Sequence, residues 1–157
     1  MFTDGPIDGI VIRPLKRFED DRGWLVELYR DDELVSGVRP AMAYVSETLP
    51  SVARGPHEHR DQTDVFAFIG PGDFKIYLWD IREDSPTRGR RQTLVAGESA
   101  PQSVVVPPGV VHAYKNISPI PGLVINCPDR LYAGESRRGP VDEIRHEDME
   151  DSPYVLD

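Results

Sequence analysis

Residues 107–116 read PPGVVHAYKN, a turn followed by a short strand that carries a histidine. Proline and glycine favour the turn, and the β-branched and aromatic residues after them favour the strand. Residues 54–59 read RGPHEH and also place imidazoles beside a turn. Residues two apart in an extended strand point the same way, so His57 and His59 share one face. If His112 arrives on a facing strand, three imidazoles converge in one pocket, which is either a metal site or an acid–base site.

Short strand-like segments separated by turns fill most of the chain. The 15 prolines and 13 glycines lie between runs rich in Val, Ile, Phe and Tyr. The expected strands are residues 7–14, 24–29, 41–46, 65–69, 74–80, 91–95, 103–106, 111–115 and 122–126. Helix is expected only in short peripheral pieces, near Asp31 to Leu34 and in the acidic tail after Arg137. This pattern predicts one all-β domain over residues 1–157, a sandwich or barrel with the tail over its outside or mouth.

Composition restricts the classes of function. A chain of 157 residues with 39% hydrophobic residues can bury a core without disulfides or a structural metal. The 18 basic and 27 acidic side chains leave a net charge of -9, which disfavours nucleic acid and anionic membranes as partners. Cys127 is the single cysteine, and no signal peptide or membrane span is recognisable, so we expect a cytoplasmic protein.

The two histidine stretches resemble the motifs of the cupin superfamily, which are small jelly-roll barrels. The first combines His-x-His with Asp64 and Gly70, and the second is Pro-x-Gly-x-x-His-x-x-x-Asn. The resemblance implies a cupin jelly-roll barrel, a double-stranded β-helix, whose pocket often binds a divalent metal. Three imidazoles and a carboxylate suit Zn, Fe, Mn or Ni. The implied ligands are His57, His59, Asp64 and His112. The alternative is that these histidines only line a polar cavity.

Five segments, in order along nearly the whole chain, narrow the resemblance. Residues 79–89 read WDIREDSPTRG and match the signature Asp-Ile/Leu-Arg-x-x-Ser-Pro-Thr-x-Gly most closely. The others are residues 18–27 (FEDDRGWLVE), 46–57 (SETLPSVARGPH), 107–114 (PPGVVHAY) and 143–148 (EIRHED). Together they resemble the dTDP-4-dehydrorhamnose 3,5-epimerase family. The resemblance implies an isomerase acting on a dTDP-4-keto-6-deoxyhexose or a related nucleotide sugar, in deoxysugar and polysaccharide biosynthesis.

The resemblance also implies roles for individual residues. His57 would be the general base and Asp148 the carboxylate behind it, while Arg22 and Arg54 would bind the nucleotide diphosphate. The other implied substrate-binding residues are Glu27, His59, His112 and Asn126. A C4 ketone acidifies the protons on C3 and C5, so a histidine with a pKa of about 6.5 can remove one. Reprotonation from the other face inverts the carbon, and neither a metal nor an organic cofactor is required.

The family forms dimers by adding strands across the barrels, so the resemblance also implies a homodimer. The apolar N-terminal segment, residues 7–14, would supply such a strand here. The expected partners are therefore a nucleotide-diphosphate sugar and a second copy of the chain.

The sequence departs from the family pattern at three places. Asn126 falls where the family has the tyrosine that acts as the opposite-face acid, so Tyr114 or Tyr132 would replace it. Asp64 falls near a family lysine, and His59 takes the place of a glutamine. The His-x-His run also resembles sugar 3,4-ketoisomerases of the same fold, which use two histidines. The alternatives are thus a 3,4-ketoisomerase, a metal-dependent cupin, or a sugar-binding relative without activity.

Overall fold

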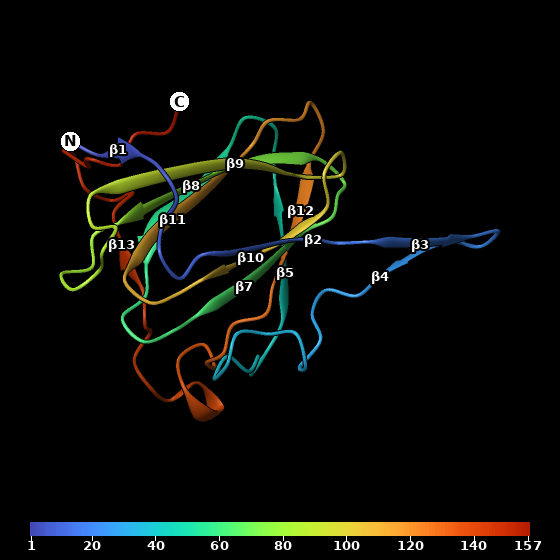
Figure 1. Cartoon of the computed structure of the whole chain (residues 1–157), viewed down its shortest axis with the longest axis horizontal. Coiled ribbons are helices and arrows are strands. Elements are labelled where there is room, and N and C mark those ends of the chain that lie inside the picture. Colours follow the sequence, from blue (N-terminus) through green and yellow to red (C-terminus); the bar gives the residue numbers. More distant parts are fainter.

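Two antiparallel sheets pack face to face in the computed structural model, which describes residues 1–157 (Figure 1). The first sheet has the order β1 (Thr3–Asp4), β9 (Arg90–Gly97), β8 (Asp73–Asp80), β11 (Val110–Asn116), β6 (Ala53–Glu58) and β13 (Ile144–Arg145). The second has the order β2 (Val11–Pro14), β10 (Gln102–Val106), β7 (Asp64–Phe68), β12 (Gly122–Asn126) and β5 (Tyr44–Thr48). Only the short β1–β9 pair is parallel. The predicted all-β jelly-roll barrel is confirmed.

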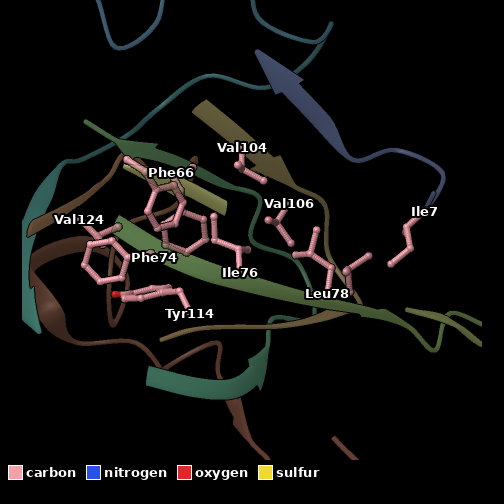
Figure 2. Packing of buried hydrophobic residues seen from close by; sticks show 12 residues of the cluster. Ile7, Phe66, Phe74, Ile76, Leu78, Val104, Val106, Tyr114 and Val124 are labelled. Atoms are coloured by element: carbon pink, nitrogen blue, oxygen red, sulfur yellow. The ribbon is translucent and has the colours of Figure 1, made fainter. Parts of the chain in front are cut away.

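The core lies between the two sheets and follows the alternation of side chains along the strands. In β8, the inward side chains are Phe74, Ile76 and Leu78, all at most 3% exposed. Figure 2 shows them packed with Tyr114 of β11 and Val104 of β10. Burial of these apolar side chains is the main favourable term for folding. The alternation predicted for residues 74–80 is therefore confirmed.

The opposite face of β8 is buried as well, because both ends of the chain cover it. Tyr77 and Trp79 point to this side, and Phe2, Tyr154 and Leu156 pack against them. Figure 1 places the two termini near each other beside β1. The tail after Arg137 thus packs over the outside of the barrel at its end, as expected.

The prediction of peripheral helices is wrong. Asp31 to Leu34 form turns, and the tail after Arg137 contains no helix, because the 3-10 turn η1 (Glu135–Arg137) ends where the tail begins. A short isolated helix is unstable without an apolar face to bury. At Asp31 to Leu34, Arg30 instead makes ion pairs with Asp32 and Glu33 within the turn. No long apolar helix of the kind that crosses a bilayer is present.

A two-stranded hairpin, β3 (Arg17–Asp20) and β4 (Gly23–Val26), projects away from the barrel (Figure 1). Its apolar residues Trp24 and Leu25 are 51% and 60% exposed. The strand expected over residues 24–29 ends at Val26, the last residue of β4. The strand expected over residues 7–14 is confined to β2, Val11–Pro14.

Candidate functional site

Two neighbouring strands of the first sheet bring the histidines together. His57 on β6 lies directly opposite His112 on β11, and their ring centroids are 4.5 Å apart. His59, just beyond the end of β6, lies 5.8 Å from the His57 ring and 5.7 Å from the His112 ring. The three imidazoles converge as predicted, although His112 arrives on an adjacent strand of the same sheet rather than on a facing one.

Two glycines with a left-handed backbone precede these histidines, Gly55 within β6 and Gly109 in the turn before β11. Gly55 has a φ of +80°, and a Cβ there would lie 2.6 Å from the carbonyl oxygen of His112. Gly109 has a φ of +74°, and its Cβ would lie 2.8 Å from Arg82 Cγ. Only glycine fits a left-handed backbone that approaches its neighbour so closely. Gly55 therefore allows β6 to approach β11 closely at His112, beside the register shift between His112 and Tyr114.

Asp64, the first residue of β7, reaches the histidines from the second sheet and is 1% exposed. Its Oδ2 lies 3.2 Å from the Nε2 atoms of both His59 and His112. Its Oδ1 accepts hydrogen bonds from the side-chain amides of Gln62, at 2.9 Å, and Asn126, at 2.8 Å. The four residues named as a possible metal set therefore lie in one cluster.

Burial and charge separate the protonation states of this cluster. Burial is the largest influence on His57 and lowers the pKa of its imidazole to about 2, with His112 and His59 acting in the same direction. Burial also acts to lower the pKa of His59, but the carboxylate of Asp64 outweighs it and raises this pKa to about 9. Burial acts to raise the pKa of Asp64, but the imidazoles of His112 and His59 hold it below its usual value. A neutral and a charged imidazole therefore stand side by side at pH 7.

A cavity of about 1020 Å³ opens beside His57 and His59. Its walls come from the strands β5, β6 and β11 and from the segment between β12 and β13. The arginines that line it are Arg54, Arg130, Arg137 and Arg145. Arg54 is held against the wall because its guanidinium donates to Thr48 Oγ1 and to the Glu47 carbonyl. Residues of the tail, among them Pro140 and Asp142, also line the cavity. The tail after Arg137 therefore lies across the mouth of the barrel before it turns to the outside.

Asp142 joins this tail to the loop that carries His59. Its carboxylate accepts hydrogen bonds from the backbone N–H groups of Arg60, Asp61 and Gln62, at 2.8–2.9 Å. Its carbonyl oxygen accepts one from His59 Nδ1. Sequence reasoning missed Asp142, because it is about 80 residues away in the chain and belongs to no motif.

Tyr44 is a second cavity residue that sequence reasoning missed. It starts β5, lies opposite Asn126 on β12, and its hydroxyl accepts a hydrogen bond from the Asn126 amide at 3.0 Å. Burial, with a smaller contribution from the charge of Asp64, raises the pKa of Tyr44 to about 12, so the hydroxyl keeps its proton at neutral pH. From the sequence, Tyr44 was predicted only as part of the strand over residues 41–46, and its contact with Asn126 was not predicted.

The other proposed acids and substrate contacts lie at different depths. Asn126 is buried behind the cavity and is engaged with Asp64 and Tyr44. Tyr114 lines the cavity, but its ring belongs to the core and its hydroxyl contacts Ser46 at 3.1 Å. Tyr132 is 58% exposed on the cavity rim.

The structure does not bring Asp148 to His57. Asp148 lies in the exposed turn after β13 and has no hydrogen bond or ion pair with that imidazole. The chain turns away there because His146 is anchored on the other face of β6 by Glu58, at 2.9 Å. The carboxylate beside the histidines is Asp64 instead.

Arg22 and Glu27 lie outside the cavity of their own chain. Arg22 is on the turn of the projecting hairpin and pairs with Asp20, whereas Glu27 pairs with Arg30 at 3.6 Å. Figure 1 shows how far this hairpin extends from the barrel.

Comparison with known proteins identifies relatives. The dTDP-4-dehydrorhamnose 3,5-epimerase family matches residues 4–149. A probable low-salt glycan biosynthesis epimerase of Haloferax volcanii is 38% identical over 127 residues, which cover 80% of this chain and 81% of that protein. The spore coat polysaccharide biosynthesis protein SpsL of Bacillus subtilis is 35% identical over 119 residues, 76% of this chain and 78% of that protein.

Solved structures share the fold. A dTDP sugar isomerase from Desulfovibrio desulfuricans has a TM-score of 0.81 at 24% identity, covering 96% of this chain and 90% of that one. A Legionella pneumophila 3,5-epimerase in complex with dTDP-4-keto-L-rhamnose has a TM-score of 0.75 at 19% identity, covering 97% and 82%. The sequence match, the fold and the histidine-lined cavity all point to the same family. The chain therefore belongs to the dTDP-4-dehydrorhamnose 3,5-epimerase family and is an isomerase of the nucleotide-sugar epimerase class.

Proposed function

We propose that the protein inverts C3, C5 or both in a dTDP-4-keto-6-deoxyhexose or a closely related nucleotide sugar. The observation that carries this proposal is the position of His57, whose ring lines a cavity of about 1020 Å³ without a hydrogen bond to the protein. The other imidazole on the wall, His59, is tied to Asp142 and lies against Asp64. His57 is therefore the imidazole with a nitrogen free to meet a substrate proton.

The chemistry of a 4-keto sugar suits this arrangement. Removal of a proton from C3 or C5 gives an enolate, whose negative charge develops on the C4 oxygen. Hydrogen-bond donors or positive charge aimed at that oxygen would stabilise the transition state, and His59 lies on the same wall as His57. Epimerisation of this kind needs no organic cofactor.

Tyr44 is the best placed acid for the opposite face. It comes from β5 of the second sheet, whereas His57 comes from β6 of the first, so the two groups enter the cavity from different walls. Its hydroxyl is held by Asn126, the residue at the position of the family tyrosine. Tyr44 would thus supply the proton that Asn126 cannot donate.

The diphosphate would lie along the arginines of the cavity wall. Arg54 is the best candidate, because Thr48 and the Glu47 carbonyl already fix the direction of its guanidinium. A guanidinium can bind two phosphate oxygens at once, which suits a diphosphate in a chain with net charge -9. We expect Arg54→Ala to weaken substrate binding by roughly 1.5–3 kcal/mol, the range for a hydrogen bond to a charged group.

A homodimer would give Arg22 a role in catalysis. Arg22 lies on the projecting hairpin, whose side chains Trp24 and Leu25 are more than half exposed, so a second barrel could receive it. Mixing Arg22→Ala chains with His57→Gln chains tests this idea. If the hairpin serves the partner's cavity, the mixture regains activity that neither variant has alone. If the mixture stays inactive, or if Arg22→Ala is fully active, Arg22 has no such role.

We also propose that the protein works in the cytoplasm. Its one cysteine, Cys127, is free and buried, as suits a reducing compartment. Fractionation of the source cells, with the nucleotide-sugar pool as a marker, would test this location.

Solvent deuterium exchange is the direct test of the proposed function. Wild-type protein in D₂O should introduce deuterium at C3 or C5 of a dTDP-4-keto-6-deoxyhexose, measured by NMR. His57→Gln should slow this exchange roughly 10²–10⁴-fold, the usual contribution of a positioned base. The matched control is His146→Gln, since His146 is the one histidine outside the cavity cluster. Normal exchange in His57→Gln would place the base elsewhere.

Ketone migration from C4 to C3 is the second candidate function. The pair of neighbouring imidazoles, His57 and His59, favours it, because migration needs proton transfer at two adjacent atoms on one side of the sugar. Product analysis separates the two functions: an epimerase keeps the ketone at C4, whereas a ketoisomerase returns a 3-keto sugar.

A further inference from the structure

Three neighbouring strands of the second sheet bring Tyr44, Asn126 and Asp64 into one row. The strands β5, β12 and β7 are adjacent in that sheet, and Asn126 on β12 lies opposite Tyr44 on one side and Phe66 on the other. Asp64 comes two residues before Phe66 and therefore shares its face of β7. The row runs from Tyr44 in the cavity wall to the buried carboxylate of Asp64.

The amide of Asn126 is oriented by Asp64. Asn126 Nδ2 donates to Asp64 Oδ1 at 2.8 Å, and a carboxylate oxygen can only accept a hydrogen bond. The flipped amide would set Asn126 Oδ1 against Asp64 Oδ1, one acceptor against another. In the orientation that the structure adopts, Asn126 Oδ1 is buried without a partner. An unpaired buried acceptor costs free energy, so the direction of the NH₂ group is what this arrangement preserves.

The second hydrogen of the same amide fixes the phenol of Tyr44. Asn126 Nδ2 carries two hydrogens, and the one that Asp64 does not use points to Tyr44 Oη at 3.0 Å. Tyr44 Oη is the acceptor in this contact, so its own hydrogen points elsewhere. No other group of the chain makes a hydrogen bond with this hydroxyl, and the cavity lies beside it. The phenol hydrogen is therefore free to point into the cavity.

We propose that Asn126 is a positioning residue that directs the phenol proton of Tyr44 into the cavity, toward the sugar face opposite His57. The catalytic part of this proposal rests on the proposed function. Asn126 is 1% exposed and does not line the cavity, so it acts through Tyr44 and does not touch the substrate. The residue at the position of the family tyrosine would thus serve proton delivery from behind, through a tyrosine of the neighbouring strand.

The proton transfers balance in this arrangement. His57 removes the proton from C3 or C5 and keeps it, while the electron pair of the C–H bond moves into the enolate. Tyr44 then gives its proton to the same carbon from the opposite face, so its O–H bond breaks, a new C–H bond forms and a phenolate remains. Solvent returns a proton to the phenolate and takes one from His57, which restores the site.

The contact with Asn126 also favours the phenolate that this transfer leaves. The amide N–H already points at Tyr44 Oη, and a hydrogen bond becomes stronger when its acceptor is ionised. Burial is the largest influence on Tyr44 and raises its pKa to about 12, whereas the Asn126 amide acts to lower this pKa. Asn126 therefore holds the phenol in the direction of transfer and eases the loss of its proton.

Exchange and inversion at the same carbon separate this role from a structural one. Exchange in D₂O needs only His57, which can return a deuteron to the face that it deprotonated, whereas inversion also needs Tyr44. NMR of the 4-keto sugar measures both rates. Asn126→Leu, a replacement of similar size without the amide, should lower the ratio of inversion to exchange about tenfold, the factor for one lost hydrogen bond. Tyr44→Phe should lower it further, and adding Asn126→Leu to Tyr44→Phe should change it no more.

A control on the same strand accounts for lost stability. Val124 belongs to the core and does not line the cavity, so Val124→Ala should keep the wild-type ratio of inversion to exchange. If Asn126→Leu fails to fold by circular dichroism, Asn126→Ala replaces it. An unchanged ratio in the Asn126 variant overturns the proposal, as does an equal change in Val124→Ala. A further fall when Asn126→Leu is added to Tyr44→Phe also overturns it, because Asn126 would then act by another route.

Neutron diffraction from a crystal of the deuterated wild-type protein tests the arrangement without a substrate. The two deuterons on Asn126 Nδ2 should point at Asp64 and Tyr44, and the O–D of Tyr44 should point into the cavity. A Tyr44 deuteron directed at Asn126 would overturn the proposal whatever the activity. If the wild type neither exchanges nor inverts any 4-keto sugar, the proposed function fails and the catalytic role of Asn126 fails with it. Wild-type inversion with an unchanged ratio in Asn126→Leu removes only the role of Asn126.

Discussion

Two buried carboxylates, Asp64 and Asp80, stand at the ends of strands and have opposite surroundings. Asp80 ends β8 and is 0% exposed. Both of its oxygens accept hydrogen bonds from the guanidinium of Arg82, at 2.9 and 2.8 Å, and Ser85 and Thr87 donate their hydroxyls to Oδ2. Asp64 begins β7, has no arginine partner, and meets two imidazoles through one oxygen.

The difference lies in the kind of positive charge that each carboxylate meets. A guanidinium keeps its proton at any pH compatible with folding, so Asp80 and Arg82 form a permanent pair that closes the loop after β8. An imidazole can gain or lose its proton near neutral pH, so the surroundings of Asp64 can change during a reaction. The first arrangement holds a loop in place, whereas the second can take part in chemistry.

The largest effect should appear when each carboxylate is neutralised and activity is measured. We expect Asp64→Asn to slow deuterium exchange roughly 10²–10⁴-fold, because the side chain that orients His59 and His112 loses its charge. Asp80→Asn is the matched control and should retain the wild-type exchange rate per folded molecule. Equal activity losses in the two variants would mean that the comparison reflects stability alone.

Unfolding measurements should reverse the ranking. Asp80→Asn leaves the guanidinium of Arg82 facing a neutral amide, and we expect a loss of about 3 kcal/mol in the free energy of unfolding. Chemical denaturation measures this value. Asp84→Asn, an exposed carboxylate of the same loop, should change it by less than about 0.5 kcal/mol. If Asp80→Asn also lowered the free energy of unfolding by less than about 0.5 kcal/mol, the loop would be held by other contacts.

Lowering the pH should remove the contribution of Asp80 to the free energy of unfolding. Burial acts to raise the pKa of Asp80, but Arg82, Ser85 and Thr87 outweigh it and hold the pKa below its usual value. A carboxyl with a lowered folded-state pKa stabilises the fold fully above its unfolded pKa of about 3.9 and loses this effect as the pH falls further. The gap in unfolding free energy between wild type and Asp80→Asn should therefore be constant from about pH 7 to pH 5 and shrink below pH 4. A gap that grows in acid would contradict this assignment.

The smallest effect is expected from the hydroxyl groups around Asp80. Ser85→Ala removes one donor to Asp80 Oδ2, while Arg82 and Thr87 remain, so we expect a loss of about 1 kcal/mol. A thermal melt detects a change of this size. No measurable change would mean that the guanidinium alone satisfies Asp80.

Much of the barrel was predictable from local pattern, and part of the site was as well. The alternation of Phe74, Ile76 and Leu78 with Tyr77 and Trp79 requires only the two-residue period of a strand. The segments that carry the histidines followed from the same period and from glycine and proline motifs, whereas the convergence of the imidazoles depended on the pairing of β6 with β11. Helices were overpredicted because acidic, polar segments can form turns with their own ion pairs when no apolar face is available.

Roles that depend on distant partners were not predictable. Tyr44 meets Asn126, which is 82 residues further along the chain, and Asp142 meets His59, which is 83 residues before it. Asp148 was expected beside His57 from its place in a motif, but the anchoring of His146 on Glu58 turns the chain away.

The sequence by itself determined the all-β class, the strands of the core and the turn and strand segments that carry the three histidines, because each rests on the period of side chains along a strand or on glycine and proline in a turn. Only the tertiary structure decided which carboxylate meets these histidines, which tyrosine borders the cavity and which residues lie outside it. These are contacts between segments far apart in the chain, and they depend on how the sheets and the tail pack together, which no local pattern encodes.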